Sequence, residues 1–481
     1  MSKQIVKAGT WSIIGQFTKL IIKFGVNIAL ARLLTPKEFG LIGMVSVIIA
    51  LLTSLGELGL FSSLIQKKEV NQRELSSVFW VSILLGIAIC LLLYFTAPLI
   101  VIFYHEEALL PIIRALSLIF LFNSLILTHN AILTKQLNFK RMELFSTISV
   151  VVASLVSLSL AFLNFGVWAL VAQQVVASVI NVGLIWLYEK WRPSFIICKD
   201  SLKNLLGFGL KVFASSIINT AFSSIDTMII GRYFSASILG LYSYAQTLIN
   251  VSVGTFTSAF VKVLFPVMSE AQNDFERLKN TYKKALNMAN LFIIPAMGTI
   301  AVLANEIIHL LLGEKWLPMV TYIQLFSILG ILYPISALNI NILLAKGRAD
   351  KFLNLEIIKK VLLVIGIGIG LSFGILGMLI GIMTISFIGV FFNLYVSGKV
   401  SGYNIKDQLI DILPIAGIAI VYLIILYLSK ILLIPFIGEL LGIGISFCLA
   451  IISFVFILFK FYPAVIDDIK ILTKGFTLKK S

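Results

Sequence analysis

Charged residues are scarce in this sequence. Aspartate, glutamate, lysine and arginine make up 12% of its 481 residues, which is roughly half the fraction found in an ordinary soluble domain. Apolar residues reach 59% and the mean hydropathy is +1.04. A water-soluble fold needs a polar shell around its core, and so few charges cannot form one. The composition therefore excludes a soluble protein and predicts a chain whose solvent is the bilayer.

Cysteine is rare as well. Cys90, Cys198 and Cys448 are isolated and show no metal-like spacing, which argues against a disulfide framework and a zinc site. The sequence also contains no phosphate-binding glycine loop and no nucleophile elbow. We therefore expect no metal, no cofactor and no enzymatic activity.

The net charge of +16 could indicate a partner such as nucleic acid. The basic residues, however, fall in short clusters between apolar runs instead of forming one stripe, so membrane topology explains them better. The first apolar run carries lysines and lacks a small-residue cleavage site, which predicts a retained helix and not a signal peptide.

Apolar runs long enough to cross the membrane recur along the whole chain. A helix needs about twenty residues to span the hydrocarbon core. The sequence predicts an all-α polytopic membrane protein with about fourteen transmembrane helices. The predicted spans cover residues 9–31, 40–64, 78–103, 109–133, 144–163, 167–188, 205–230, 239–267, 285–312, 320–345, 355–371, 375–396, 409–428 and 437–459.

The loops alternate between basic and poor in basic residues, beginning with a basic amino terminus and ending with a basic tail. Lysine and arginine accumulate in cytoplasmic loops of membrane proteins. We therefore expect both termini in the cytoplasm of a bacterial cell, with the chain in the plasma membrane. Two cytoplasmic termini require an even number of spans, which agrees with fourteen.

The chain contains an internal repeat. Arg32 through Gly40 matches Arg232 through Gly240 at an offset of 200 residues. Further matches set Asn130 and Lys135 against 341 and 346, an offset of 211, and residues 165–167 against 373–375, an offset of 208. Collinear matches of this kind predict two six-helix lobes in parallel repeat, related by an axis along the membrane normal, plus two C-terminal helices. The predicted domains are residues 1–190, 191–400 and 401–481.

Polar residues recur at helical spacing on the first predicted helix. Gln16, Lys19, Lys23 and Asn27 form one stripe on an otherwise apolar segment. Lys19 lies about 15 Å past the entry point, near the midplane, where an ionisable side chain needs water or a partner. Lys23 is nearer the outer surface, and its alternative is to extend its ammonium group to the interface.

The equivalent helix of the second lobe and its neighbours carry polar faces too. As substrate-binding residues the sequence predicts Gln16, Lys19, Lys23, Asn27, Lys211, Asn219 and Asn250, and as coupling carboxylates Glu57 and Asp226. The alternatives are that the neutral residues tie helices together and that Lys211 reaches the cytoplasmic interface. Arg32 and Arg232 are as well explained by bonds to the last carbonyls of their helices as by substrate contact.

Several segments resemble a known family. Residues 31–40 (ARLLTPKEFG), 56–59 (GELG), 131–140 (AILTKQLNFK) and 165–174 (FGVWALVAQQ) are similar to segments of the polysaccharide transporters in the multidrug/oligosaccharidyl-lipid/polysaccharide flippase superfamily. The resemblance implies two six-helix bundles around a central cavity. It also implies an undecaprenyl-diphosphate-linked oligosaccharide as substrate, moved from the cytoplasmic to the outer leaflet.

The expected function is therefore a flippase that works by alternating access, since lysines in a water-filled passage suit an anionic carrier. A drug antiporter of the same superfamily and, further away, a membrane polysaccharide polymerase or ligase are the alternatives. Expected partners are the lipid-linked oligosaccharide, membrane lipid, a polysaccharide polymerase and glycosyltransferases. We expect a monomer.

Overall fold

In the computed structural model of the chain, every regular element of the described residues is a helix, which confirms the predicted all-α class. Eleven helices in the described part are long and apolar enough to cross a membrane. The chain divides into two compact units, residues 1–243 and 244–481. The predicted three-domain division stays a prediction. The structure describes residues 3–57, 59–67, 70–196, 198, 216–270 and 274–461.

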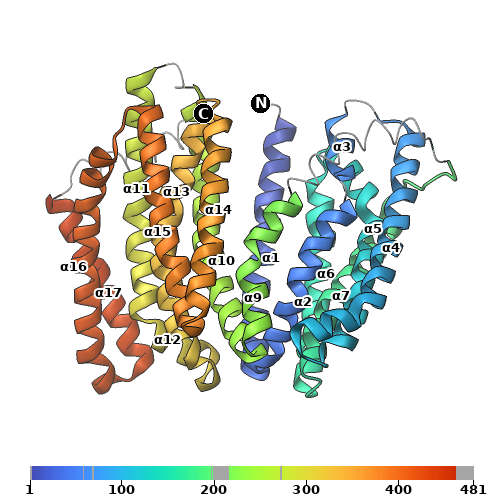
Figure 1. The fold of residues 1–481 in the computed structure, drawn as a ribbon, viewed down its shortest axis with the longest axis horizontal. Coiled ribbons are helices and arrows are strands. Elements are labelled where there is room, and N and C mark those ends of the chain that lie inside the picture. Colours follow the sequence, from blue (N-terminus) through green and yellow to red (C-terminus); the bar gives the residue numbers. More distant parts are fainter. Residues whose placement is uncertain are drawn as a thin grey trace. The chain divides into compact units, whose positions relative to one another are not determined.

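The first unit is a helical bundle in which α4 lies along α5, α6 along α7, and α1 along α6 (Figure 1). Asn71 and Glu74 cap the amino terminus of α4 by reciprocal side-chain bonds. Its helices are α1 (Lys3–Leu33), α2 (Pro36–Glu57), α3 (Leu60–Gln66), α4 (Gln72–Tyr104), α5 (Leu109–Lys135), α6 (Phe139–Phe162), α7 (Val167–Tyr188), α9 (Ile225–Tyr233) and the start of α10 (Ala236–Glu270).

The second unit is built around α11, which packs against α13 and α16, while α14 pairs with α15 and α16 with α17 (Figure 1). Its core contains a closed polar cluster. The hydroxyl oxygen of Tyr282 lies 2.5 Å from Oδ1 of Asn339 and 3.0 Å from Oε1 of Gln408. Besides the rest of α10, its helices are α11 (Phe275–Val302), α12 (Ala304–Leu312), η1 (Glu314–Met319), α13 (Val320–Ala345), α14 (Ala349–Leu371), α15 (Gly374–Ser401), α16 (Ile405–Ile437) and α17 (Glu439–Phe461).

The predicted spans coincide with helical backbone in the part that the structure describes, but three of them are interrupted, the span at 205–230 by a turn at Ser224. The span at 40–64 breaks at Gly59, whose φ of 65° is left-handed and ends α2 before α3 begins. The span at 285–312 breaks at Leu303, between α11 and α12. The span at 205–230 is described only from residue 216 onward, so Lys211 lies outside the described residues.

Two turns reproduce the internal repeat. The turn after α5 and the turn after α13 contain the same backbone hydrogen bonds, each with a left-handed residue, Leu137 at φ 54° and Gly347 at φ 68°. These residues are 210 positions apart (347 minus 137), so the sequence offset of 211 is wrong by one residue. The error arose because residues 135 and 346 are both lysine and were therefore aligned. The hydrogen bonds show that Gln136, and not Lys135, occupies the position equivalent to Lys346.

The helix starts of α2 and α10 cross at a pair of glycines inside the first unit. A Cβ atom on Gly40 would overlap the carbonyl oxygen of Ala236, and a Cβ atom on Gly240 would overlap that of Pro36. The first contact joins residue 40 to residue 236, and the second joins residue 240 to residue 36. A shift of 200 residues exchanges the two contacts, so the crossing follows the internal repeat. Only glycine permits two helix backbones to approach so closely.

We expect Gly40→Ala and Gly240→Ala each to destabilise the protein by about 1–3 kcal/mol, because the added methyl group has only backbone to displace. Gly183→Ala in α7 is the matched control, since no atom lies within 4 Å of the Cβ position there. Thermal unfolding of the purified protein in detergent measures the difference. Equal stability of Gly40→Ala and Gly183→Ala would show that the crossing is not a close backbone contact.

Candidate substrate site

The polar stripe of α1 is present, and its residues differ in their surroundings. Lys19 faces α6, where its Nζ lies 2.7 Å from Oε2 of Glu143 and donates to Oγ of Ser146 at 3.2 Å. The side chains of Lys19 and Glu143 are 21% and 7% exposed, so the ion pair is largely inside the helix bundle. A buried carboxylate requires such a partner. The structure therefore joins Lys19 to a protein carboxylate that the sequence analysis missed.

Gly15 makes room for this ion pair. A Cβ atom on Gly15 would lie 2.6 Å from Cβ of Glu143, so the glutamate stem rests on the backbone of α1. Lys19 follows one helical turn later and reaches the carboxylate. Glu143 was overlooked because it immediately precedes the predicted span at 144–163, in a stretch interpreted as a basic loop. Two features of the sequence together could have predicted the ion pair. Gly15 and Lys19 stand four residues apart on one helix, and an isolated glutamate stands at the start of another.

The depth predicted for Lys19 also needs correction. Helix α6 starts at Phe139, so Glu143 lies in its second turn and Lys19 is level with that turn. Leu30 packs against Ala161 near the other end of α6, so the two helices run in the same direction. Lys19 is therefore closer to the basic α5–α6 turn than to the middle of the span, and Lys23 is the more central lysine.

Lys23 differs from Lys19 in being exposed on the first unit. It forms no ion pair and no hydrogen bond with another described residue. Gln16 is exposed and donates to Oγ of Ser12 at 3.1 Å, and Asn27 is half-buried. Of the two lysines in the polar stripe of α1, Lys23 is thus the cation available to an external anion.

The remaining predicted residues are spread over several helices. Asp226 begins α9, accepts a hydrogen bond from the Thr227 amide at 2.8 Å and another from the hydroxyl of the buried Tyr242. Asn219, in the helical stretch 216–223, and Asn250 on α10 are exposed. Glu57 is the last residue of α2, and its side chain lies outside the described part, as does all of Lys211.

The last turn of α9 is stabilised by contacts within the first unit. The guanidinium of Arg232 bonds to Nδ1 of His105 and lies over the Phe103 ring, 5.5 Å from its centroid. Arg232 lines an open cavity of about 570 Å³. Lys37 and Glu106 line it too, and Nζ of Lys37 lies 3.2 Å from Oε1 of Glu106. These contacts favour the structural interpretation of Arg232.

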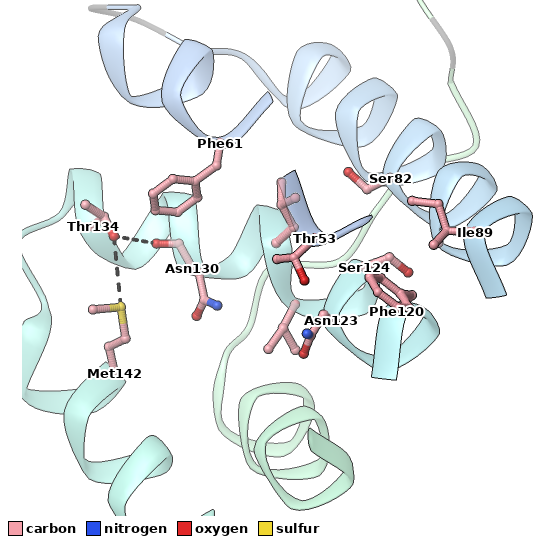
Figure 2. A pocket seen from close by; sticks show the side chains of 13 residues that line it. Thr53, Phe61, Ser82, Ile89, Phe120, Asn123, Ser124, Asn130, Thr134 and Met142 are labelled. Carbon is pink, nitrogen blue, oxygen red and sulfur yellow. Dashed lines mark hydrogen bonds between the residues drawn. The ribbon is translucent and has the colours of Figure 1, made fainter. Parts of the chain in front are cut away.

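A second cavity, of about 300 Å³, lies inside the first unit, bordered by α2 to α6. Figure 2 shows Thr53, Phe61, Asn123 and Asn130 around the same opening. The sequence analysis missed this cavity, although Asn123 and Ser124 interrupt an apolar run. The signal available was the i, i+7 spacing of Asn123 and Asn130 on α5. The lining residues are Thr53, Phe61, Ser82, Gly86, Ile89, Phe120, Asn123, Ser124, Ile126, Leu127, Asn130, Thr134 and Met142.

The fold is shared with solved multi-pass membrane proteins. A structure titled "Lipid II flippase MurJ, inward closed conformation" aligns with 95% of this chain and 99% of its own, with a TM-score of 0.75 and 18% identity. An inward-facing multidrug resistance MATE transporter of the MOP superfamily aligns with 81% of this chain and 99% of its own, with a TM-score of 0.61 and 17% identity. At these identities the likeness concerns the fold.

The family follows from the sequence itself. Residues 29–321 match the family described as "Polysaccharide biosynthesis protein", and because this is more than half of the chain, the protein belongs to that family. The resemblance predicted from the sequence segments is confirmed.

Three curated relatives illustrate the family. The lipopolysaccharide biosynthesis protein WzxC of Escherichia coli (strain K12) is 26% identical over 86% of this chain and 85% of its own. The teichuronic acid biosynthesis protein TuaB of Bacillus subtilis (strain 168) is 28% identical over 73% of each chain. The succinoglycan biosynthesis transport protein ExoT of Rhizobium meliloti (strain 1021) is 26% identical over 66% of this chain and 64% of its own.

We expect Glu143→Ala to destabilise the protein by on the order of 3 kcal/mol, because it leaves Lys19 unpaired among helices. The double exchange Lys19→Glu with Glu143→Lys should recover most of that loss. Glu189→Ala is the matched control: it removes the Arg141 ion pair at 3.3 Å, in which the arginine is 56% exposed and contributes little. Thermal unfolding in detergent ranks the variants, and a Glu143→Ala protein as stable as Glu189→Ala would rule out a stabilising buried pair.

Proposed function

We propose that the protein flips a lipid-linked oligosaccharide or polysaccharide unit, carried on undecaprenyl diphosphate, from the cytoplasmic to the outer leaflet of the bacterial plasma membrane. Three observations support this: membership of the polysaccharide biosynthesis family, the fold shared with a lipid II flippase, and lysines on a membrane-spanning helix. The relatives are named for lipopolysaccharide, teichuronic acid and succinoglycan. The protein acts as a transporter and not as an enzyme.

The single observation that carries the substrate assignment is the exposed ammonium group of Lys23 on α1, which has no ion-pair partner among the described residues. A cation on a membrane helix is tolerated only beside water or a counter-ion. The diphosphate of the carrier, or an acidic sugar, supplies that counter-ion. Lys19 joins the site only when an anion displaces Glu143, so Lys23 makes the first contact and Lys19 the second.

The other predicted residues keep their proposed roles. Gln16, Asn27, Lys211, Asn219 and Asn250 supply neutral or cationic contacts along the substrate passage. Glu57 and Asp226 are the carboxylates proposed for coupling. For Asp226 the support is its hydrogen bond with the buried Tyr242, because protonation of the carboxylate would change that bond.

In this proposal two six-helix lobes in parallel repeat and two further helices, residues 1–190, 191–400 and 401–481, form a monomeric transporter with both termini in the cytoplasm. Alternating access moves the substrate. Glycosyltransferases supply the lipid-linked sugar and a polymerase consumes it. A neighbour in fold is a multidrug resistance transporter. For this chain, export of a cationic drug is disfavoured because Lys23 would repel such a substrate.

Changing Lys23 to alanine should lower export at least tenfold, and changing Lys19 and Lys23 together should abolish it, because the polar stripe of α1 then offers the diphosphate no cation. Lys23→Arg should retain most activity. The measurement is surface polysaccharide in a strain whose own exporter is deleted, with membrane-inserted protein quantified in parallel.

Lys140→Ala is the matched control for these variants. Lys140 lies at the start of α6, with its Nζ 5.0 Å from the centroid of the Trp11 ring, and it is exposed. Wild-type export by the Lys19→Ala, Lys23→Ala protein would refute anion binding by α1. Efflux of ethidium by the wild-type protein without polysaccharide export would support the drug antiporter instead.

A further inference from the structure

The cavity between α2 and α6 in the first unit differs chemically from the lysine-bearing face of α1. Its described lining contains no charged residue, but six polar side chains on apolar walls: Thr53, Ser82, Asn123, Ser124, Asn130 and Thr134. We propose that this cavity binds one neutral sugar ring of the transported saccharide. The proposal rests on the proposed function and adds a second part to the substrate site.

The four hydroxyl groups of the cavity have already used their donors. Each bonds to a backbone carbonyl of its own helix: Thr53 to Ile49 at 2.7 Å, Ser82 to Val78 at 2.7 Å, Ser124 to Leu121 at 2.7 Å and Thr134 to Asn130 at 2.8 Å. A hydroxyl group that donates in this way still has lone pairs to accept with. The hydroxyl groups therefore present acceptors and require a ligand that brings O–H or N–H groups.

The two asparagines supply both kinds of hydrogen-bonding group. Asn123 and Asn130 lie two turns apart on α5, about 10 Å along the helix axis. Neither side-chain amide bonds to another residue in the described part of the chain. Each amide offers two N–H donors and one carbonyl acceptor. Phe61 and Phe120 add aromatic walls on which the C–H face of a pyranose can lie.

This arrangement selects among ligand classes. An anion such as phosphate finds no cation in the cavity and meets hydroxyl groups that can only accept. A hydrocarbon chain leaves the amides unpaired, at a cost of about 1–3 kcal/mol for each group. A neutral sugar donates from its hydroxyl groups and covers the apolar walls. The volume of about 300 Å³ is at the lower end for small-molecule sites, which suits one ring and not a chain.

The cavity also lies at the appropriate end of the unit. Thr134 and Met142 line it and flank the turn between α5 and α6, which belongs to the loops expected in the cytoplasm. Met142 is followed by Glu143, the partner of Lys19, so one turn of α6 contacts both the cavity and the ion pair. A lipid-linked sugar arriving from the cytoplasm can thus meet both parts of the site.

Saturation-transfer difference NMR on the full-length protein in phosphatidylethanolamine/phosphatidylglycerol nanodiscs tests the proposal. The probes are the methyl β-glycosides of glucose, galactose and N-acetylglucosamine, with glucuronate as the anionic probe and cyclohexanol as the apolar ring. We expect at least one glycoside to give a signal above those of glucuronate and cyclohexanol. Asn123→Leu with Asn130→Leu should reduce that signal at least fivefold, and Thr53→Val should reduce it two- to threefold.

The matched control is Asn341→Leu in α13, an asparagine of the second unit. Its amide donates to the Ala337 carbonyl at 2.7 Å, so its loss should leave glycoside binding unchanged. The absence of any glycoside signal from the wild-type protein, or a stronger cyclohexanol signal, would overturn the proposal without the use of a variant. Undiminished binding by both the double variant and Thr53→Val would overturn it too.

The two proposals fail in different ways. Polysaccharide export by a wild-type protein that binds no glycoside would leave the flippase proposal standing and remove the sugar cavity. Glycoside binding that depends on Asn123 and Asn130, in a protein whose Lys19 and Lys23 are dispensable for export, would support the cavity and remove the anion site.

Discussion

The cost of an unpaired charge in hydrocarbon constrains this structure more than any other term. No water replaces a missing partner there, so each cation on a spanning helix must have a counter-ion or a wet surface. Lys19 meets the condition with Glu143, and Gly15 provides the space in which the carboxylate can lie. Lys23, one turn further along α1, has no such partner in the described part of the chain. The contrast between two neighbouring lysines is what makes α1 suited to an anionic cargo.

The internal repeat shares backbone geometry between its halves but not the chemistry of their interiors. The turns at Leu137 and Gly347 have the same hydrogen bonds and the same left-handed residue. In the second unit the side-chain oxygens of Asn339 and Gln408 both lie within hydrogen-bonding distance of the Tyr282 hydroxyl, and their amide nitrogens donate to backbone carbonyls. Asn123 and Asn130 in the first unit face a cavity instead. The scaffold is duplicated, while the groups available to a ligand differ between the units.

Much of the fold follows from the sequence. A helix satisfies all of its backbone hydrogen bonds within the bilayer, and a long apolar run in the sequence marks each such helix. The repeat offset at Gly40 and Gly240 even anticipated a contact. The site was harder to predict. The stripe on α1 identified Lys19, but its partner Glu143 is distant in sequence and precedes a predicted span. Cavities depend on packing between several helices, so Asn123 within an apolar run gave no warning. The sequence contains Gly59 within a predicted span, but it did not predict that this glycine adopts a left-handed conformation and interrupts the helix.

The two parts of the proposed substrate site also divide affinity from selectivity. A diphosphate is common to every carrier-linked sugar, so lysines that bind it attract the whole class without distinguishing its members. Hydrogen bonds from neutral amides and hydroxyl groups depend on where each sugar hydroxyl lies, and a buried polar group left unpaired is costly. In this proposal, selectivity among glycans comes from the cavity around Asn123 and Asn130. Met142 lines the cavity and Glu143 pairs with Lys19, so the selective part and the charged part of the proposed site share helix α6. A sugar that displaces α6 would therefore also change the distance between Glu143 and Lys19.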